Sequence, residues 1–279
     1  MKDNREKILG LLIVLTLLFS LFTIYVASND LPGVSARAAA LYEPESNRFL
    51  YEKNAEERLS MASTTKIMTA LISLEHLDLN EEITVDERAC GIEGSSVYLK
   101  PGEVLTAEDL IYALMLGSAN DAAEALAYEI SGSPDSFTEL MNERARSLGL
   151  TDTNFKNPHG LDCEGHYTTA KDLALITACA MSLPKFNEIV STYKKTIKSS
   201  AETRVLVNHN KLLQSYNGCI GTKTGYTKKS GRSLVSAVER DALCLICVTI
   251  DAPSDWRDHK NLLDYGLSIL KAQRPYIQE

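Results

Sequence analysis

The stretch LSMASTTKIMTALISLEH, residues 59–76, begins with a short polar segment and continues as an apolar run. Its apolar residues recur at helical rather than strand spacing, so we expect a largely buried helix whose first turn carries Ser63. Residues three positions apart share one face of a helix. The pattern S-x-x-K therefore predicts that the Lys66 amine lies beside the Ser63 hydroxyl.

This pattern is not specific when it stands alone. An N-cap serine followed by an unrelated surface lysine is the alternative interpretation of any S-x-x-K match. The same chain offers three further matches, Ser182/Lys185, Ser191/Lys194 and Ser268/Lys271. The assignment therefore depends on what else the chain provides.

Two further short motifs complete a set with Ser63. Ser118-Ala119-Asn120 falls at a turn between two expected helices, and Lys223-Thr224-Gly225 falls on an expected strand. Decoys exist for both, Ser215-Tyr216-Asn217 and Lys229-Ser230-Gly231. The first set is spaced widely enough to place its members on a helix start, a helical lobe and an edge strand. In the decoy set Pro184 interrupts the turn between serine and lysine, which disfavours a helix carrying both on one face.

The order of elements predicts one domain built from remote parts of the chain. We expect strands over 36–42, 48–52, 220–229, 232–239 and 242–250, a hairpin over 95–105, helices through most of 106–190, a loop over 154–167 and a last helix over 255–273. Thr106 to Asp109 matches a capping box. Strands at both ends and helices between predict an α/β (α+β) fold with an inserted helical lobe at about 75–190. In such a fold the active site usually lies in the seam between the sheet and the helical lobe.

Residues 8–27 form an uncharged apolar run long enough to cross a bilayer. Lys2, Arg5 and Lys7 precede it and the next basic residue is Arg37, which predicts a cytoplasmic N-terminus and an extracytoplasmic catalytic part at the cell membrane. The alternative is a cleaved signal peptide with its site near Ala36-Arg37-Ala38. We expect residues 1–30 to be the stub and anchor, 36–270 the catalytic domain and 271–279 a short tail, without a C-terminal β domain.

Composition excludes several functions. Hydrophobic residues make up 44% of the 279 residues and charged residues 24%, which suits a globular core rather than disorder. The net charge is -8 and no Lys/Arg cluster offers itself to phosphates, so we expect no nucleic-acid partner. Cys244 and Cys247 lie in an apolar run with strand character, where an odd separation points two side chains to opposite faces. We predict core thiols and no metal.

The first motif set supplies what acyl transfer requires. A serine hydroxyl is a poor nucleophile until a base removes its proton. Lys66 is such a base only if its pKa falls, and burial and the second cation, Lys223, both disfavour its charged form. Ser118 is suited to relay the proton to the departing nitrogen, and the Asn120 amide to hold a peptide carbonyl of the substrate.

Backbone groups complete this chemistry. Gly225 has no side chain, so an extended substrate has room beside its strand. Backbone N–H groups of Ser63 and Tyr226 are the expected donors to the developing oxyanion.

The motifs STTK, SAN and KTG, with the connecting FKNPHGL, YTTAKDLALI and NHNKLL segments, resemble the serine D-alanyl-D-alanine carboxypeptidases, the low-molecular-mass penicillin-binding proteins. The resemblance covers residues 36–270. It implies a β-lactamase/transpeptidase-like fold, with an antiparallel sheet flanked by helices and an inserted all-helical lobe. The substrate implied is the D-Ala-D-Ala end of a peptidoglycan stem peptide, with β-lactams as covalent inhibitors and no cofactor.

The resemblance also implies roles for individual residues. Ser63 is the acylated nucleophile, Lys66 the base, and Ser118, Asn120 and Lys223 relay protons or contact the substrate. Thr224 meets the terminal carboxylate, and Tyr226 completes the oxyanion hole. Where some relatives carry an arginine before KTG this chain has His209, so no carboxylate-binding arginine is assigned.

Two alternatives stay open at this point. A class A β-lactamase uses the same three motifs but adds a glutamate with an asparagine four residues later on a loop after S-x-N. Here Glu164 is followed by Thr168, and Glu139 precedes Asn142 by only three positions, so we expect slow deacylation of penicillin. The other alternative is a membrane-tethered sensor that binds penicillin without turnover. A Ser-His triad using His159 or His166 is disfavoured, because the lysine already supplies a base.

Overall fold

The computed structural model describes Thr16 and residues 31–273. Met1–Gly33 and Val34–Glu279 are separate compact units, and the strands and helices named below lie in the second. The predicted anchor at 8–27 lies outside the described residues except for Thr16. Among the described residues no single helix has the length and composition to cross a membrane; only the pair α6 (Ala170–Met181) and α7 (Pro184–Ser191), bent by 106°, passes that test jointly.

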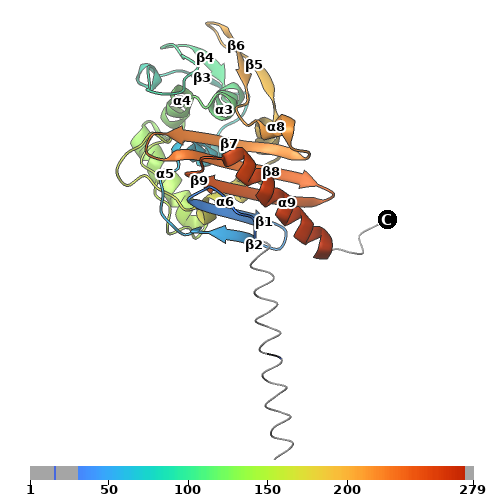
Figure 1. Cartoon of the computed structure of the whole chain (residues 1–279). Coiled ribbons are helices and arrows are strands. Elements are labelled where there is room, and N and C mark those ends of the chain that lie inside the picture. Colours follow the sequence, from blue (N-terminus) through green and yellow to red (C-terminus); the bar gives the residue numbers. More distant parts are fainter. Residues whose placement is uncertain (1–15, 17–30, 274–279) are drawn as a thin grey trace, which may run out of the picture. The chain divides into compact units, whose positions relative to one another are not determined.

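A five-stranded antiparallel sheet organises this unit (Figure 1). Its strand order is β2-β1-β9-β8-β7, with β1 at Ala38–Glu43, β2 at Arg48–Lys53, β7 at Cys219–Thr227, β8 at Gly231–Arg240 and β9 at Leu243–Ile250. The two N-terminal strands thus join the three C-terminal ones in one sheet through the pairing of β1 with β9, as predicted. Strand β7 is an edge strand of this sheet, so one side of its backbone is free of a ladder partner within the described residues.

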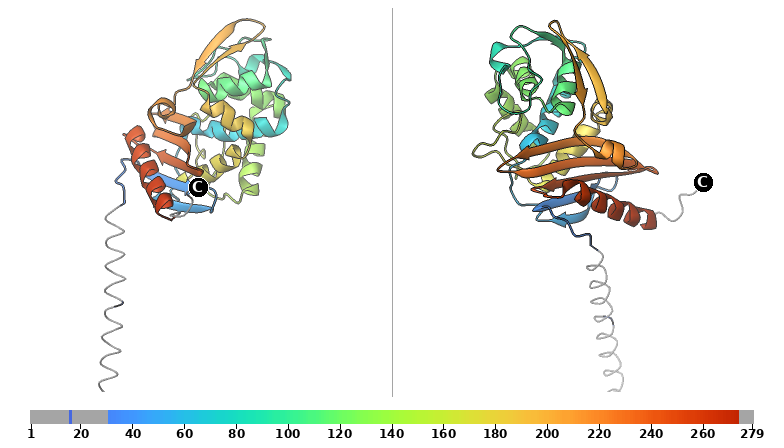
Figure 2. Two further views of the ribbon diagram at one scale, coloured as in Figure 1. Left: turned by 90° about the vertical axis from the view of Figure 1, so that its right-hand side faces the viewer. Right: turned by 45° about the horizontal axis from the view of Figure 1, so that its top comes forward.

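The two faces of the sheet are covered differently (Figure 2). Helix α9 (Asp255–Gln273) packs on one face, where Leu41 and Leu245 belong to a small apolar cluster. The next residues along these strands turn to the other face and join the larger core that the helices build. Its helices are α2 (Lys66–His76), α3 (Ala107–Leu116), α4 (Asn120–Ser131), α5 (Pro134–Ser147), α6 and α7, followed in the chain by the short α8 (Leu212–Ser215).

Most predicted elements are confirmed. The last helix has the predicted bounds, and the Thr106 side chain caps α3 by accepting from the Asp109 N–H.

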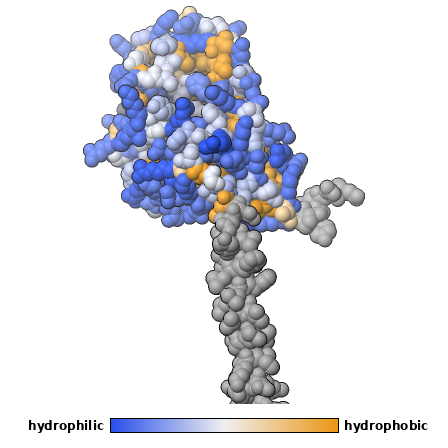
Figure 3. Space-filling model, in the orientation of Figure 1, coloured by the Kyte–Doolittle hydropathy of each residue, from blue (hydrophilic) through white to orange (hydrophobic). Residues whose placement is uncertain are grey.

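Cys247 is buried in the cluster under α9, and Cys244 is only partly buried. All six cysteines are free thiols, and the described residues contain no group of three or more His, Cys, Asp or Glu side chains able to hold a metal ion. Figure 3 shows that hydrophilic residues dominate the surface in this view.

The hairpin predicted over residues 95–105 is wrong. The turn at Pro101-Gly102 exists, but only Val104–Thr106 forms a strand, β4, and it pairs with β3 at Glu82–Thr84. The reason lies in Asp121, a buried carboxylate of α4 that accepts from the backbone N–H groups of Val97 and Leu99. Those N–H groups are therefore not available for a hairpin ladder.

A hairpin that the sequence did not predict is formed by β5 (Lys194–Lys198) and β6 (Thr203–Val207). It lies beside α3 (Figure 1) and is tied to the loop before β4 by Arg204, whose guanidinium pairs with the buried carboxylate of Glu103. Arg204 Nε also donates to the Val97 carbonyl at 2.7 Å.

Candidate active site

Ser63 and Lys66 lie side by side, as the S-x-x-K spacing predicts. Ser63 is carried by one turn of 3-10 helix, η1 (Ala62–Thr65), that leads into α2, rather than by the first turn of the α-helix itself. Lys66 Nζ lies 3.1 Å from Ser63 Oγ. The lysine is fully buried whereas the serine is half-buried, so the hydroxyl faces solvent and the amine does not.

The Lys66 amine has two acceptors besides the serine. It donates to Asn120 Oδ1 and to the backbone carbonyl of His159, each at 2.6 Å. Burial lowers the pKa of Lys66 well below its ordinary value, the charge of Lys223 lowers it further, and the Asp121 carboxylate opposes both. The Lys66 amine therefore loses its proton more readily than an exposed lysine does.

A second serine–lysine pair joins remote parts of the chain. Lys223 Nζ on β7 donates to Ser118 Oγ at 3.0 Å and to the Thr224 carbonyl at 2.9 Å. Burial lowers the pKa of Lys223 to about 7. Ser118 has φ +56° and Ala62, before the nucleophile, has φ +48°, a region that non-glycine residues seldom adopt and that is frequent at active sites.

Alternation along β7 sends its motif residues to two sides. Lys223 and Gly225 face the helical side, toward Ser118 and the turn that carries Ser63. A Cβ at Gly225 would lie 3.1 Å from the Ser63 backbone nitrogen and 3.2 Å from the Met61 carbonyl oxygen. The glycine thus lets β7 approach the nucleophile's own backbone, in addition to the room it leaves for a substrate.

The predicted loop at 154–167 packs against α2 and against Ala62, the residue before the nucleophile. The Pro158 carbonyl accepts from Thr69 Oγ1 at 2.5 Å, and Asn157 Oδ1 accepts from the Gly160 N–H at 2.6 Å. Gly160 has φ +93°, and a Cβ there would lie 1.9 Å from the Ala62 carbonyl oxygen. The loop therefore sits against the residue before Ser63, with no room for a side chain at Gly160.

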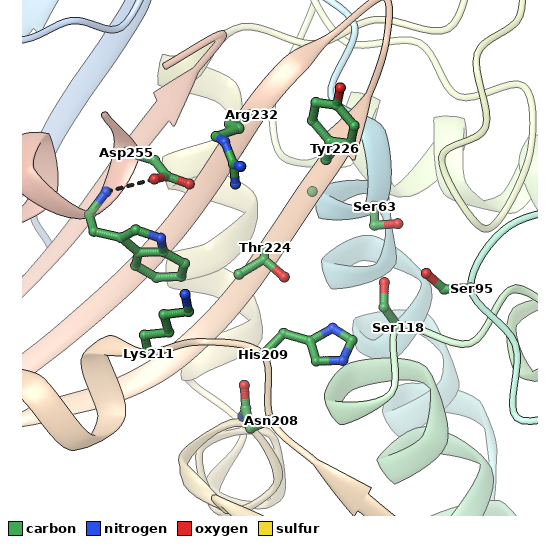
Figure 4. A pocket seen from close by; sticks show the side chains of 12 residues that line it. Ser63, Ser95, Ser118, Asn208, His209, Lys211, Thr224, Tyr226, Arg232 and Asp255 are labelled. Carbon is green, nitrogen blue, oxygen red and sulfur yellow. Dashed lines mark hydrogen bonds between the residues drawn. The ribbon is translucent and has the colours of Figure 1, made fainter. Parts of the chain in front are cut away.

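Ser63 and Ser118 line one cavity of about 540 Å³, together with residues of β7, β8, α9 and the segment before α8 (Figure 4). Thr224 and the 64% exposed Tyr226 line it with Ser63, Ser118 and Gly225, so five of the eight predicted site residues line this cavity. Lys66 and Lys223 are buried beside Ser63 and Ser118. Asn120 is the eighth: its Oδ1 binds Lys66 and its Nδ2 donates to the Glu93 carbonyl at 2.6 Å, which leaves one N–H.

Several lining residues were not predicted from the sequence, namely Ser95, Asn208, Lys211, Arg232, Asp255 and Trp256. Arg232 pairs with Tyr226 across the β7–β8 hairpin, and its guanidinium carbon lies 5.8 Å from the Tyr226 ring centroid. The turn between β7 and β8 is short, so the sequence could have predicted that Arg232 lies opposite Tyr226 on the neighbouring strand. His209 also lines the cavity, and burial and the Lys223 charge lower its pKa.

The rings of the two loop histidines, His159 and His166, do not bond to Ser63. His159 Nδ1 accepts from the Leu161 N–H at 3.1 Å, and His166 Nδ1 accepts from the Lys156 N–H at 3.0 Å. His166 Nε2 lies 2.8 Å from Thr65 Oγ1, and burial lowers the pKa of His166 to about 4. The disfavoured Ser-His triad is therefore absent from the described residues.

The decoy motifs serve other purposes. Ser182 Oγ donates to the Cys179 carbonyl at 2.7 Å, and Lys185 pairs with Glu108 at 2.9 Å. Ser230 Oγ closes the β7–β8 turn by bonding Thr227. Glu164 and Glu139, the glutamates weighed for a β-lactamase, are both exposed.

Comparison with known proteins gives one consistent result. The family model for D-alanyl-D-alanine carboxypeptidases matches residues 25–254. D-alanyl-D-alanine carboxypeptidase DacF of Bacillus subtilis is 36% identical over 78% of this chain, and DacC of Escherichia coli is 36% identical over 88%. The chain spans 57% of the length of DacF and 64% of that of DacC. The crystal structure of the Streptomyces K15 DD-transpeptidase superposes with a TM-score of 0.81 at 31% identity, covering 85% of this chain and 98% of that one. The predicted fold class is thereby confirmed.

Proposed function

Because the chain belongs to the D-alanyl-D-alanine carboxypeptidase family, we propose that it removes the terminal D-alanine from peptidoglycan stem peptides through an acyl-enzyme on Ser63. The observation that carries this proposal is the buried amine of Lys66 at 3.1 Å from a solvent-facing serine hydroxyl. A neutral lysine has two N–H groups, which match the carbonyls of Asn120 and His159. Its lone pair is then left to accept the Ser63 proton.

In the acylation step, Ser63 Oγ attacks the carbonyl carbon of the penultimate D-alanine while Lys66 takes the hydroxyl proton. Backbone N–H groups of Ser63 and Tyr226 stabilise the oxyanion. The C–N bond then breaks as Ser118 delivers a proton to the departing amine, and the Ser118 proton is restored through Lys66 or Lys223. Water hydrolyses the ester by the reverse proton transfers and frees Ser63.

Substrate binding is assigned to the open edge of β7. An extended peptide can add to a free sheet edge through main-chain hydrogen bonds, and β7 is the edge strand beside Ser63. Asn120 supplies its remaining N–H to a peptide carbonyl, and Thr224 meets the terminal carboxylate. Arg232 lines the same cavity, and we assign it as the cation that accompanies this carboxylate.

The decisive experiment incubates the full chain with a diacetylated tripeptide ending in D-Ala-D-Ala and measures released D-alanine. Release by the wild type, and none by Ser63→Ala, is the expected result. Covalent labelling by penicillin without any release would instead support the non-turnover sensor. Rapid hydrolysis of nitrocefin would support the β-lactamase, whereas we expect a long-lived acyl-enzyme because no loop glutamate matches that family's pattern.

Location is part of the proposal. The apolar run at 8–27 and the basic residues before it favour a membrane anchor with the catalytic domain outside the cytoplasm, where stem peptides are found. We retain 36–270 as the catalytic domain, with a helical lobe at about 75–190. Protease digestion of intact cells tests this topology: the catalytic domain is expected to be accessible from outside.

A further inference from the structure

A buried carboxylate stands behind the Ser63–Lys66 pair and has no part in the chemistry described above. Glu124 Oε1 lies 3.2 Å from His159 Nε2, and the two side chains are only 9% and 10% exposed. Both residues come from elements that frame Lys66: Glu124 from α4 and His159 from the 154–167 loop.

The hydrogen bond at Nδ1 fixes the tautomer of the neutral His159 ring. Nδ1 accepts from the Leu161 N–H at 3.1 Å, so it carries no proton. In the neutral ring the proton then resides on Nε2, which lies 3.2 Å from Glu124 Oε1. Each ring nitrogen thus has a polar neighbour, and rotation of the ring would separate it from both.

The backbone of the same histidine touches the catalytic machinery. The His159 carbonyl accepts from Lys66 Nζ at 2.6 Å. One turn of α4 before Glu124, Asn120 Oδ1 accepts from the same amine, also at 2.6 Å. Helix α4 therefore reaches Lys66 twice, directly through Asn120 and indirectly through the Glu124–His159 pair.

We propose that Glu124 is a positioning residue, which holds the His159 ring and thereby keeps the His159 carbonyl on the Lys66 amine. The loop has little regular structure to do this by itself, since its own backbone forms one isolated bridge, between Asn154 and Tyr167, and one turn bond, from the His166 N–H to the Cys163 carbonyl. A buried carboxylate is costly unless it has a partner, and an apolar residue would fill the space at lower cost. The inference rests on the proposed role of Lys66 as base.

Three variants of the full chain test this: Glu124→Ala, Glu124→Gln and, as a control, Glu129→Gln, an exposed glutamate of the same helix. Acylation by a fluorescent penicillin is followed over a range of concentrations, which separates the rate constant of acylation from the binding constant. Glu124→Ala is expected to lower the rate constant about 10- to 100-fold with binding within about twofold, because misplacing a catalytic group costs that much. Glu124→Gln keeps an acceptor for Nε2 and is expected to stay within about threefold of wild type.

A second readout does not depend on activity. In protein labelled with ¹⁵N-histidine, the His159 signals, assigned with His159→Asn, should report a fixed neutral Nε2–H tautomer in wild type and Glu124→Gln. Glu124→Ala should lose this fixed state. If Glu124→Gln is as slow as Glu124→Ala, charge rather than the hydrogen bond matters and the inference is overturned; it is also overturned if Glu124→Ala acylates at the wild-type rate or keeps the tautomer. If wild type is not acylated at all, the proposed function fails, while the tautomer still decides whether Glu124 positions His159.

Discussion

The two serine–lysine pairs of this protein have nearly the same geometry and opposite origins. Ser63 and Lys66 are three residues apart and their side chains lie 3.1 Å from each other, whereas Ser118 and Lys223 are 105 residues apart and lie at 3.0 Å. The first pair follows from helical spacing, and the second exists only because the helical lobe packs against the edge of the sheet. The same short distance can thus be set by local backbone geometry or by the whole core.

The pairs also differ in how burial is compensated. Both lysines are buried, which disfavours their charged forms. Lys66 meets acceptors from α4 and from the 154–167 loop, whereas Lys223 has Ser118 and a carbonyl of its own strand. We therefore expect the Ser63–Lys66 pair to depend on the acceptors from α4 and the 154–167 loop. The Ser118–Lys223 pair should depend only on the packing of the helical lobe against β7.

The largest effect is expected from Lys66→Met, which removes the base and keeps the side chain's bulk. Acylation by penicillin should slow about 10³- to 10⁴-fold, the upper range for general-base removal. The matched control is Lys185→Met in the decoy motif, which should acylate at the wild-type rate. A loss of less than tenfold in Lys66→Met would mean that another group takes the Ser63 proton.

Gly160→Ala tests whether the loop supports the local pair. Its Cβ would lie 1.9 Å from the Ala62 carbonyl oxygen, so the loop or the nucleophile turn must move. We expect the free energy of unfolding in urea to fall by about 3 kcal/mol, as for other severe steric changes, together with slower acylation.

Gly149→Ala is the control for this variant. Gly149 also has positive φ, at +76°, but a Cβ there would meet no neighbouring atom within 4 Å, so only the backbone conformation is penalised, by about 1 kcal/mol. Equal losses in the two variants would refute the steric explanation.

Ser118→Ala breaks the remote pair without altering the local one. We expect acylation to slow about 10- to 100-fold, less than for Lys66→Met, because a proton relay is removed but the base remains. Ser215→Ala, in the exposed decoy S-x-N, serves as the control. The comparison of the two pairs would need revision if Ser118→Ala were as slow as Lys66→Met.

The smallest effect concerns pH. Burial lowers the pKa of Lys223 to about 7, so this lysine loses its charge as the pH rises through that value. If the charge assists acylation, the wild-type rate falls above neutral pH. In Lys223→Arg the guanidinium stays protonated, so the falling limb should move above pH ~9. If the acylation rate falls at the same pH in wild type and Lys223→Arg, the fall is due to a group other than Lys223. Lys229→Arg is the control and should keep the wild-type pH profile.

Prediction from the sequence succeeded where pattern and structure are both local. Helix α9 runs over the predicted residues, with Asp255 and Asp258 in its first turn and Lys271 in its last. The hairpin at 95–105 failed because a side chain from another helix, Asp121, takes its N–H groups. The β5–β6 hairpin and Arg232 were missed because their significance depends on what packs beside them.

The sequence by itself determined the motif residues, the order of the central-sheet strands and main helices, and the contact between Ser63 and Lys66, since a helical turn fixes the distance between residues three apart whatever surrounds it. Only the tertiary structure decided that Lys223 meets Ser118, that the Gly160 loop backs the nucleophile, and that Glu124 and Arg232 stand where they do. No local rule sets a distance across 105 residues. That distance results from the packing of the whole core, where each side chain's place depends on all its neighbours.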